Sequence, residues 1–140
     1  KMRIFDCTTF YSEHLMMDIR FNILNEFVDK FIVCESTISH SGKKKKLNFD
    51  INNYPKFKDK INYIVIDEEP LNIIGDKNGL AKPYEQRSDS LKRIELSYDY
   101  MIKALSDVND DDLIILSDND EIPNLNSKQF KNSKKDILIF

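Results

Sequence analysis

The segment that most constrains the fold is Leu113-Ile114-Ile115-Leu116, a run of four branched apolar residues. Such a run predicts a parallel strand that is buried on both faces at the centre of a sheet. Lys30–Cys34 and Ile61–Ile66 are similar apolar segments and predict two more strands. A fourth is expected where Arg3–Phe5 leads into Asp6-Cys7-Thr8-Thr9.

Helical patterns lie between these strands. Leu15, Ile19, Ile23 and Phe27 recur every four residues, which predicts a helix packed along that stripe, with Ser12 as its N-cap. A longer helix is expected from Pro83, which suits a first-turn position, to Leu105. Its predicted core stripe consists of Leu91, Ile94, Tyr98, Met101 and Leu105.

The remaining segments complete an alternating pattern. A short helix is expected over Asp50–Lys60, with an interruption at Pro55, and another near Asn126–Asn132 before a last strand at Ile137–Phe140. Alternating strands and helices predict an α/β fold, a three-layer α/β/α arrangement around a mostly parallel sheet. The 140 residues fit a single domain, 1–140. Because the chain stops in an apolar strand, we expect this domain to be incomplete.

Composition and charge limit the classes of partner that we expect the protein to bind and the cell compartment in which we expect it. Lysine and arginine number 21 against 24 acidic residues, and the dense basic run Lys43–Lys46 is too short for a nucleic-acid platform. No apolar run approaches the ~20 residues of a transmembrane helix, and no signal-peptide pattern is present. We therefore expect a cytoplasmic protein, with at most a peripheral association with a membrane. Cys7 and Cys34 fall in apolar strands and are expected to be buried, unpaired residues.

The acidic triplet Asp118-Asn119-Asp120 follows the most apolar strand directly. In open α/β sheets, ligands bind beyond the carboxyl ends of the strands. Residues i and i+2 of an extended segment project to the same side, roughly 6–7 Å apart, so both carboxylates can approach one divalent ion. Oxygen ligands favour Mg²⁺ or Mn²⁺. The alternative is an acidic turn that caps the next helix and faces solvent.

Other families place acidic residues in similar patterns. An EF-hand loop is excluded, because Ile122 stands at its third ligand position and Pro123 at its glycine. A haloacid-dehalogenase-type phosphatase, with Asp118 as nucleophile, requires further motifs beyond this chain. A nucleotidyltransferase lacks its usual Gly-rich basic loop here, and a non-catalytic nucleotide-binding domain also stays open.

Four blocks of sequence resemble glycosyltransferase family 17, which includes bisecting β-1,4-N-acetylglucosaminyltransferases. Leu113 to Pro123 is similar to the family signature D-D-x-I-I-x-S-D-x-D-E-I-P, and Phe31 to Thr37 with Ser41-Gly42-Lys43 to its V-E-S-T…F-S-G-K segment. The other two blocks are Ile4 to Arg20 and Glu85-Gln86-Arg87. The chain departs from the family pattern at His40, Lys44 and Lys46, and in having no Trp.

The resemblance implies the donor half of a GT-A (Rossmann-like) domain. It implies a UDP-sugar donor, with N-acetylglucosamine as the sugar, a glycan or glycoconjugate acceptor, and inversion at the anomeric carbon. Asp118 and Asp120 take the metal-binding role, with Mn²⁺ or Mg²⁺ as cofactor, and Asp118 also contacts the nucleotide sugar. The acceptor half and the general base are expected to lie outside the chain.

Six further residues are candidates for nucleotide-sugar binding. Asp6 and Thr8 are expected to follow the first strand, and Glu35 and Ser36 the second, where such folds receive the nucleotide. Arg87 is a candidate to contact the diphosphate or brace the aspartates, and Lys43 to approach phosphates or an anionic acceptor. The alternatives are structural turns for the first four residues, a surface salt bridge for Arg87 and a solvated face for Lys43.

Overall fold

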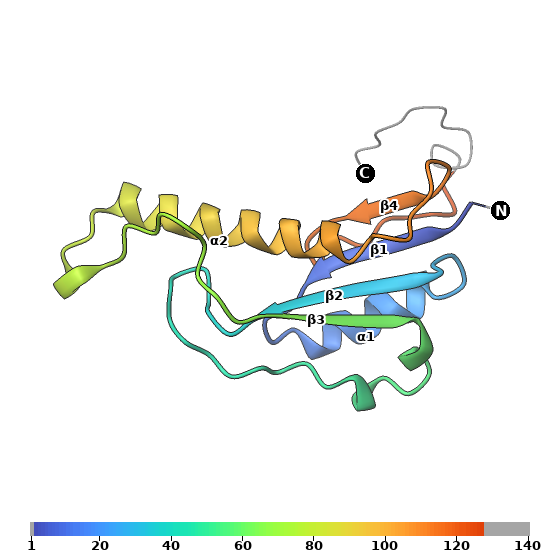
Figure 1. Ribbon diagram of the computed structural model, residues 1–140. Coiled ribbons are helices and arrows are strands. Elements are labelled where there is room, and N and C mark those ends of the chain that lie inside the picture. The colour runs from blue at the N-terminus through green and yellow to red at the C-terminus, as the bar shows by residue number, and fades with distance from the viewer. Residues whose placement is uncertain (1, 128–140) are drawn as a thin grey trace.

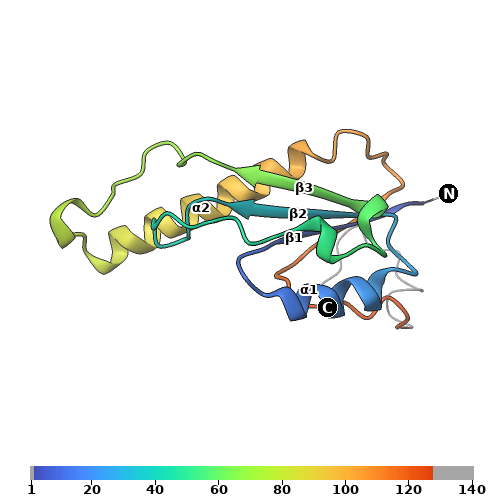
Figure 2. The ribbon, with the colours of Figure 1, turned by 90° about the horizontal axis from the view of Figure 1, so that it is seen from below.

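The computed structural model describes residues 2–127, which form a four-stranded sheet with one α-helix over each face (Figures 1 and 2). The strands are β1 (Ile4–Thr9), β2 (Lys30–Ser36), β3 (Ile61–Ile66) and β4 (Leu113–Leu116), in the spatial order β3-β2-β1-β4. Neighbouring strands within this range are parallel. The predicted α/β class and the three-layer arrangement are confirmed.

Helix α1 (His14–Leu24) covers one face of the sheet. Its buried residues are Met17, Arg20, Phe21 and Leu24, and the three apolar ones pack with strand residues of β1, β2 and β4 and with a group of aromatic side chains. The predicted stripe is wrong at Leu15, Ile19 and Ile23, which are exposed, while Phe27 is partly buried against the core but lies after the end of the helix. The face that contacts the sheet contains an arginine, which a count of apolar residues does not select. Ser12 is not the N-cap either, since that position belongs to Glu13.

Helix α2 (Pro83–Lys103) covers the opposite face, where it packs on β2 and β3. Met101 contacts a cluster of buried strand residues, Cys7, Ile32, Cys34 and Ile66. The predicted stripe is confirmed at Met101 but wrong at Leu91 and Tyr98, which are exposed, while Asp89 and Ser97 are buried instead. The N-terminal half of the helix extends beyond the carboxyl ends of the strands (Figure 1), so it has no sheet beneath it.

Strand β4 stands at the end of the sheet order in the described part of the chain. Ile115 is buried, but Ile114 and Leu116 are 45% and 51% exposed. The expectation of a central strand buried on both faces is therefore wrong for these residues. The reason is that, among residues 2–127, α2 packs on β2 and β3, whereas the residues that pack on β4 belong to the cluster on the α1 side.

The connecting segments agree in part with the predictions. Two short 3₁₀ turns, η1 (Ile51–Asn53) and η2 (Lys58–Lys60), flank Pro55, and a third, η3 (Lys77–Gly79), precedes α2. The strand predicted at 137–140 and most of the helix predicted at 126–132 lie outside the described residues. Within 2–127, neither helix is long and apolar enough to cross a bilayer.

The order of the strands creates a topological switch point between β1 and β4. The chain runs from β1 to β2 and β3 on one side, then returns to the other side of β1 as β4. In open parallel sheets the crevice at such a reversal, outside the carboxyl ends of the strands, is the usual ligand site. The fold thus places the segments after β1 and β4 at this crevice.

Candidate donor site

A cavity of about 1030 Å³ lies at the carboxyl ends of the strands. Its walls come from the segments that end or follow the strands and from one face of α2. They comprise Thr9–Met16 after β1, Cys34, Ser36, Ile38–Ser41 and Lys45 from β2 and its loop, Ile66 of β3, Arg93 and Ser97 of α2, and Asp118–Asp120 after β4. The cavity therefore includes the switch point and extends from there across β2 to β3.

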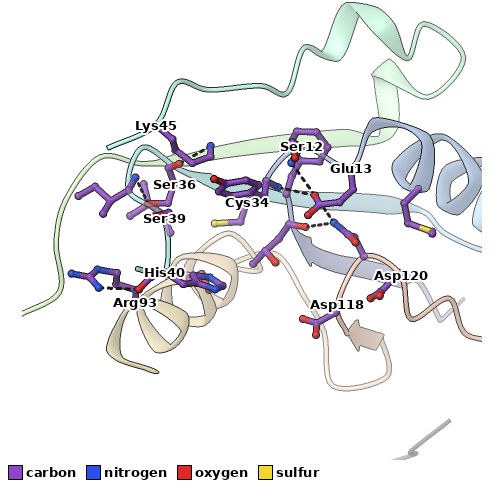
Figure 3. Close-up of a pocket in the computed structure, with 18 of the residues that line it drawn as sticks. Ser12, Glu13, Cys34, Ser36, Ser39, His40, Lys45, Arg93, Asp118 and Asp120 are labelled. Atoms are coloured by element: carbon purple, nitrogen blue, oxygen red, sulfur yellow. Dashed lines mark hydrogen bonds between the residues drawn. The ribbon is translucent and has the colours of Figure 1, made fainter. Parts of the chain in front are cut away.

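The carboxylates of Asp118 and Asp120 both belong to this cavity. The two side chains are exposed and lie on the same side of the cavity, across from His40 and Arg93 (Figure 3). In the described residues, no group of three or more His, Cys, Asp or Glu side chains could hold a metal ion. With Asp118 and Asp120 as its protein ligands, Mg²⁺ or Mn²⁺ would need phosphate oxygens and water to complete its coordination, which is the usual arrangement for Mg²⁺.

Asn119 links the triplet Asp118-Asn119-Asp120 by hydrogen bonds to the end of β1 and the residues after it. Its side-chain amide donates to Glu13 Oε2 at 2.9 Å and to the Thr9 carbonyl at 3.4 Å. Partial burial acts to raise the pKa of Glu13, but hydrogen bonds from the backbone of Tyr11, Ser12 and Glu13 and from Asn119 outweigh it, and the net pKa is lowered. The cavity thus carries a third carboxylate that is anionic at neutral pH.

Asp6 lies inside the protein and not on the cavity wall. Its carboxylate is buried and receives two hydrogen bonds from the buried guanidinium of Arg20, Nε to Oδ2 at 2.8 Å and Nη2 to Oδ1 at 2.7 Å. Thr8 is also buried, and its hydroxyl donates to the Thr9 carbonyl at 3.4 Å. The structure brings Thr9, the next residue, to the cavity in their place.

Glu35 likewise has its carboxylate occupied inside the fold. It accepts from Lys45 Nζ at 2.6 Å, from the backbone N–H of Asn48 and Phe49, and from the Tyr63 hydroxyl. Burial acts to raise the pKa of Glu35, but these four donors outweigh it and the net pKa is lowered. The carboxylate therefore fastens the loop after β2 to the sheet.

Ser36, the residue after Glu35, does line the cavity. Its hydroxyl oxygen accepts a hydrogen bond from the backbone N–H of Ile38 at 3.0 Å. It thus stands at the start of the loop that forms the wall facing the aspartates.

Lys43 and Arg87 are exposed and are absent from the cavity wall, where the structure places Lys45 and Arg93. Lys45 is paired with Glu35, and Arg93 makes two hydrogen bonds to the carboxylate of Glu69, at 2.9 and 3.0 Å. Both cations of the wall are therefore already neutralised by carboxylates. Sequence reasoning missed them because no motif separates Lys45 from its three neighbouring lysines, and Arg93 belongs to an ordinary amphipathic helix.

The loop that carries His40 closes one side of the cavity. Ile38 and Lys44 form an antiparallel bridge, and Gly42 stands at the turn with φ of +84°. A Cβ at Gly42 would lie 2.7 Å from Arg93 Nη2, and Arg93 Nη1 donates to the His40 carbonyl at 2.9 Å. The glycine of the Ser41-Gly42-Lys43 segment is thus required both for the turn and for the approach of Arg93.

The two cysteines behave as the apolar context predicts. Both are unpaired and buried, and burial raises the pKa of each thiol to about 12. Although Cys34 contributes to the cavity wall, it has no thiolate character at neutral pH, so it acts as a small apolar residue.

Comparison with known proteins identifies the family of the chain. The family model of glycosyltransferase family 17 matches residues 1–137. The enzyme named beta-1,4-mannosyl-glycoprotein 4-beta-N-acetylglucosaminyltransferase is 28% identical in Rattus norvegicus and in Homo sapiens, and 27% identical in Mus musculus. Each alignment covers 86% of this chain but 22% of the relative. No solved structure matches significantly. From the match over nearly its whole length, the chain belongs to glycosyltransferase family 17.

Proposed function

We propose that residues 1–140 form the donor-binding part of a metal-dependent glycosyltransferase that uses a UDP-sugar. The observation that carries this proposal is the position of Asp118 and Asp120, whose side chains line one cavity at the switch point of a parallel sheet. Ligands of open α/β sheets bind at this place. Membership of a glycosyltransferase family makes a nucleotide sugar the expected ligand.

The charges around the cavity support a need for a cation. Glu13, Asp118 and Asp120 contribute three carboxylates, while the two cationic side chains of the wall, Lys45 and Arg93, are paired with Glu35 and Glu69. A diphosphate would meet unfavourable electrostatic repulsion from the carboxylates. Mn²⁺ or Mg²⁺ held by Asp118 and Asp120 supplies the positive charge that stabilises a departing diphosphate.

The opposite wall is suited to the neutral parts of a nucleotide sugar. Ser36, Ser39 and Ser41 bring hydroxyl groups to the cavity, and Tyr11 presents a ring that is 51% exposed. We place the nucleoside on this side and the diphosphate beside the aspartates. The cavity volume is at the upper end of the roughly 300–1,000 Å³ of small-molecule sites.

The names of the relatives indicate N-acetylglucosamine as the transferred sugar and a mannosyl glycoprotein as their acceptor. For this protein we propose a glycan acceptor whose hydroxyl attacks the anomeric carbon with inversion. That hydroxyl must lose a proton to a general base. We do not assign this role to Glu13, because its Oε2 already accepts three hydrogen bonds, from the N–H groups of Tyr11 and Ser12 and from Asn119. Its hydrogen bonds fit it instead to hold Asn119.

Isothermal titration calorimetry with UDP, with and without Mn²⁺, tests the proposal. We expect Mn²⁺ to increase UDP affinity at least tenfold, and the double substitution Asp118→Asn, Asp120→Asn to abolish that increase. The matched control is Asp110→Asn, Asp111→Asn, which removes the same charge from exposed residues at the other end of β4. Equal UDP affinity with and without Mn²⁺ in the unmodified protein would contradict the proposal.

The same protein can be tested as a phosphatase. Asp118 as a nucleophile predicts steady hydrolysis of p-nitrophenyl phosphate in the presence of Mg²⁺, lost in Asp118→Asn. The glycosyltransferase proposal predicts no such turnover, and the family match gives the phosphatase interpretation no support.

A further inference from the structure

We propose that Arg20 is a positioning residue. From the interior of the protein it sets the conformation of Ser117–Glu121, which we call the acidic segment. Arg20 belongs to α1, is 0% exposed and does not line the cavity. Its effect on the metal-binding step rests on the proposed function, whereas its effect on the shape of the segment does not.

The guanidinium distributes its donors between Asp6 and the acidic segment. Nε and Nη2 each donate one hydrogen bond to the carboxylate of Asp6. Nη2 also donates to Ser117 Oγ at 2.7 Å. Nη1 donates to three backbone carbonyls, those of Asp118 at 3.0 Å, Asn119 at 3.3 Å and Glu121 at 3.0 Å. All three nitrogens are therefore used.

These contacts orient the segment. The carbonyls of residues 118, 119 and 121 converge on Arg20 Nη1, which lies in the interior. The side chains of Asp118 and Asp120 instead reach the cavity. Two bonds within the segment close the turn, from Ser117 Oγ to the Glu121 carbonyl at 3.0 Å and from the Glu121 N–H to the Asp118 carbonyl at 3.1 Å. Arg20 thus holds the backbone carbonyls inward, and the side chains of Asp118 and Asp120 face the cavity.

Asp6 has the complementary task of fixing Arg20. The bidentate pair sets the plane of the guanidinium, and the carboxylate neutralises a charge that would otherwise be buried without a partner. Lysine cannot replace arginine in this role, because its single ammonium lacks the planar arrangement needed to reach both Asp6 and the three carbonyls. The contacts therefore predict that Arg20→Lys keeps the charge but loses control of the segment.

A matched control exists at the other end of the same two strands. Arg3 makes hydrogen bonds through Nε and Nη2 to the carboxylate of Asp112, just before β4, and so resembles Arg20 in chemistry. The hydrogen bonds of its side chain go to Asp107 and Asp112, outside residues 117–121. Arg3→Lys thus disturbs an arginine–aspartate pair between β1 and β4 while leaving the acidic segment alone.

Amide hydrogen exchange of Ser117 and Glu121 is the first readout. Both amides donate to carbonyls, those of Cys7 and Asp118. We expect Arg20→Lys to accelerate their exchange at least tenfold relative to amides in the middle of β2, and Arg3→Lys to leave this ratio unchanged. Equal ratios in the two variants would overturn the inference. This readout needs no ligand, so it decides the role of Arg20 even if UDP binding proves independent of Mn²⁺.

The second readout is the increase in UDP affinity on adding Mn²⁺. Loss of groups that orient metal ligands usually costs about 10–100-fold in metal affinity or activity. We expect Arg20→Lys to reduce the Mn²⁺-dependent increase by about this factor, with metal-free UDP affinity within twofold of the unmodified protein. A full Mn²⁺ effect in Arg20→Lys would contradict the inference. Absence of the effect in the unmodified protein would contradict the proposed function instead.

Ser117→Ala keeps the inference testable if Arg20→Lys does not fold. It removes one acceptor of Arg20 and one of the two bonds that close the turn, while the buried ion pair stays intact. We expect faster exchange at Glu121 and a three- to tenfold smaller Mn²⁺ effect. No change in either quantity would count against the proposed role.

Discussion

Asp6 and Glu35 differ from Asp118 and Asp120 in the groups that surround their carboxylates. In the sequence all four are similar, since each is an acidic residue in or directly after an apolar strand. The first two are 1% exposed and receive hydrogen bonds from a cation or from backbone and side-chain donors inside the protein. The last two are exposed and line the cavity.

The difference teaches that the position of a carboxylate in a parallel sheet does not decide whether it binds a ligand. A buried carboxylate must be paired and hydrogen-bonded, because burial of an isolated charge is costly. Arg20 pairs with Asp6, and Lys45 and Tyr63 bind Glu35. These carboxylates therefore stabilise the fold and do not bind a ligand in the cavity. A carboxylate that faces water at the carboxyl edge keeps its oxygens for a cation.

The largest expected effect tests whether Asp6 belongs to the fold. Asp6→Ala leaves the buried guanidinium of Arg20 without its counter-ion, and removal of one partner from a buried pair costs about 3–5 kcal/mol. Urea denaturation should show a loss of this size, with a smaller loss for Asp6→Asn, which keeps an acceptor. A loss below about 1 kcal/mol for Asp6→Ala would break the comparison.

Glu35→Gln should lower the free energy of unfolding by about 2–3 kcal/mol at pH 7, because hydrogen bonds to a charged group are replaced by bonds to a neutral one. The effect should depend on pH. Since the folded-state pKa of Glu35 is below its ordinary value of 4.5, its contribution is present above that value and is lost as the pH falls through the folded pKa. The stability difference between the two proteins should therefore shrink on acidification, as measured by urea denaturation between pH 7 and pH 3. A difference independent of pH would exclude the charge of Glu35 as its cause.

Gly42→Ala extends the comparison to a cation of the cavity wall, Arg93, which is held in place by Glu69 and by the His40 carbonyl. A left-handed backbone costs a residue with a Cβ about 1–2 kcal/mol, and the new Cβ would also press on Arg93. Gly75→Ala is the control, since it has a similar φ and no atom within 4 Å of the added Cβ. Thermal unfolding should show the larger loss for Gly42→Ala. Equal losses would mean that Arg93 moves aside at no cost.

The smallest effect on stability is expected at the proposed metal site. Substitutions of exposed residues usually change the free energy of unfolding by no more than ~0.5 kcal/mol. The double substitution Asp118→Asn, Asp120→Asn also removes repulsion between neighbouring acidic side chains. Chemical denaturation without metal should therefore show little loss or a slight gain. A loss above about 1.5 kcal/mol would place these two residues with Asp6 and Glu35 as parts of the fold.

The layers and strands could be predicted because they depend on local periodicity. Ile61–Ile66 is a strand with the predicted limits, and Lys30–Cys34 extends by two residues to Ser36. The buried faces of the helices could not be predicted in the same way. Arg20 and Asp89 occupy those faces and are satisfied by partners 14 or more residues away, which an apolar count does not detect.

The candidate site shows the same division. Asp118 and Asp120 reach the cavity as the sequence predicts, because they follow the end of β4 and their side chains stay exposed. Asp6, Glu35 and Arg87 do not reach it. For Asp6 and Glu35 the outcome depends on donors from α1, from the loop after β2 and from β3, and the sequence gives no sign of these pairings.

The most direct test of the metal site is diffraction from crystals grown with UDP and Mn²⁺, with anomalous data collected at the manganese edge. We expect one strong anomalous peak within about 2.1 Å of carboxylate oxygens of Asp118 or Asp120, the distance typical of Mg²⁺-like coordination, with diphosphate oxygens on its other side. A nucleotide bound in the cavity with no manganese near either aspartate would contradict the account.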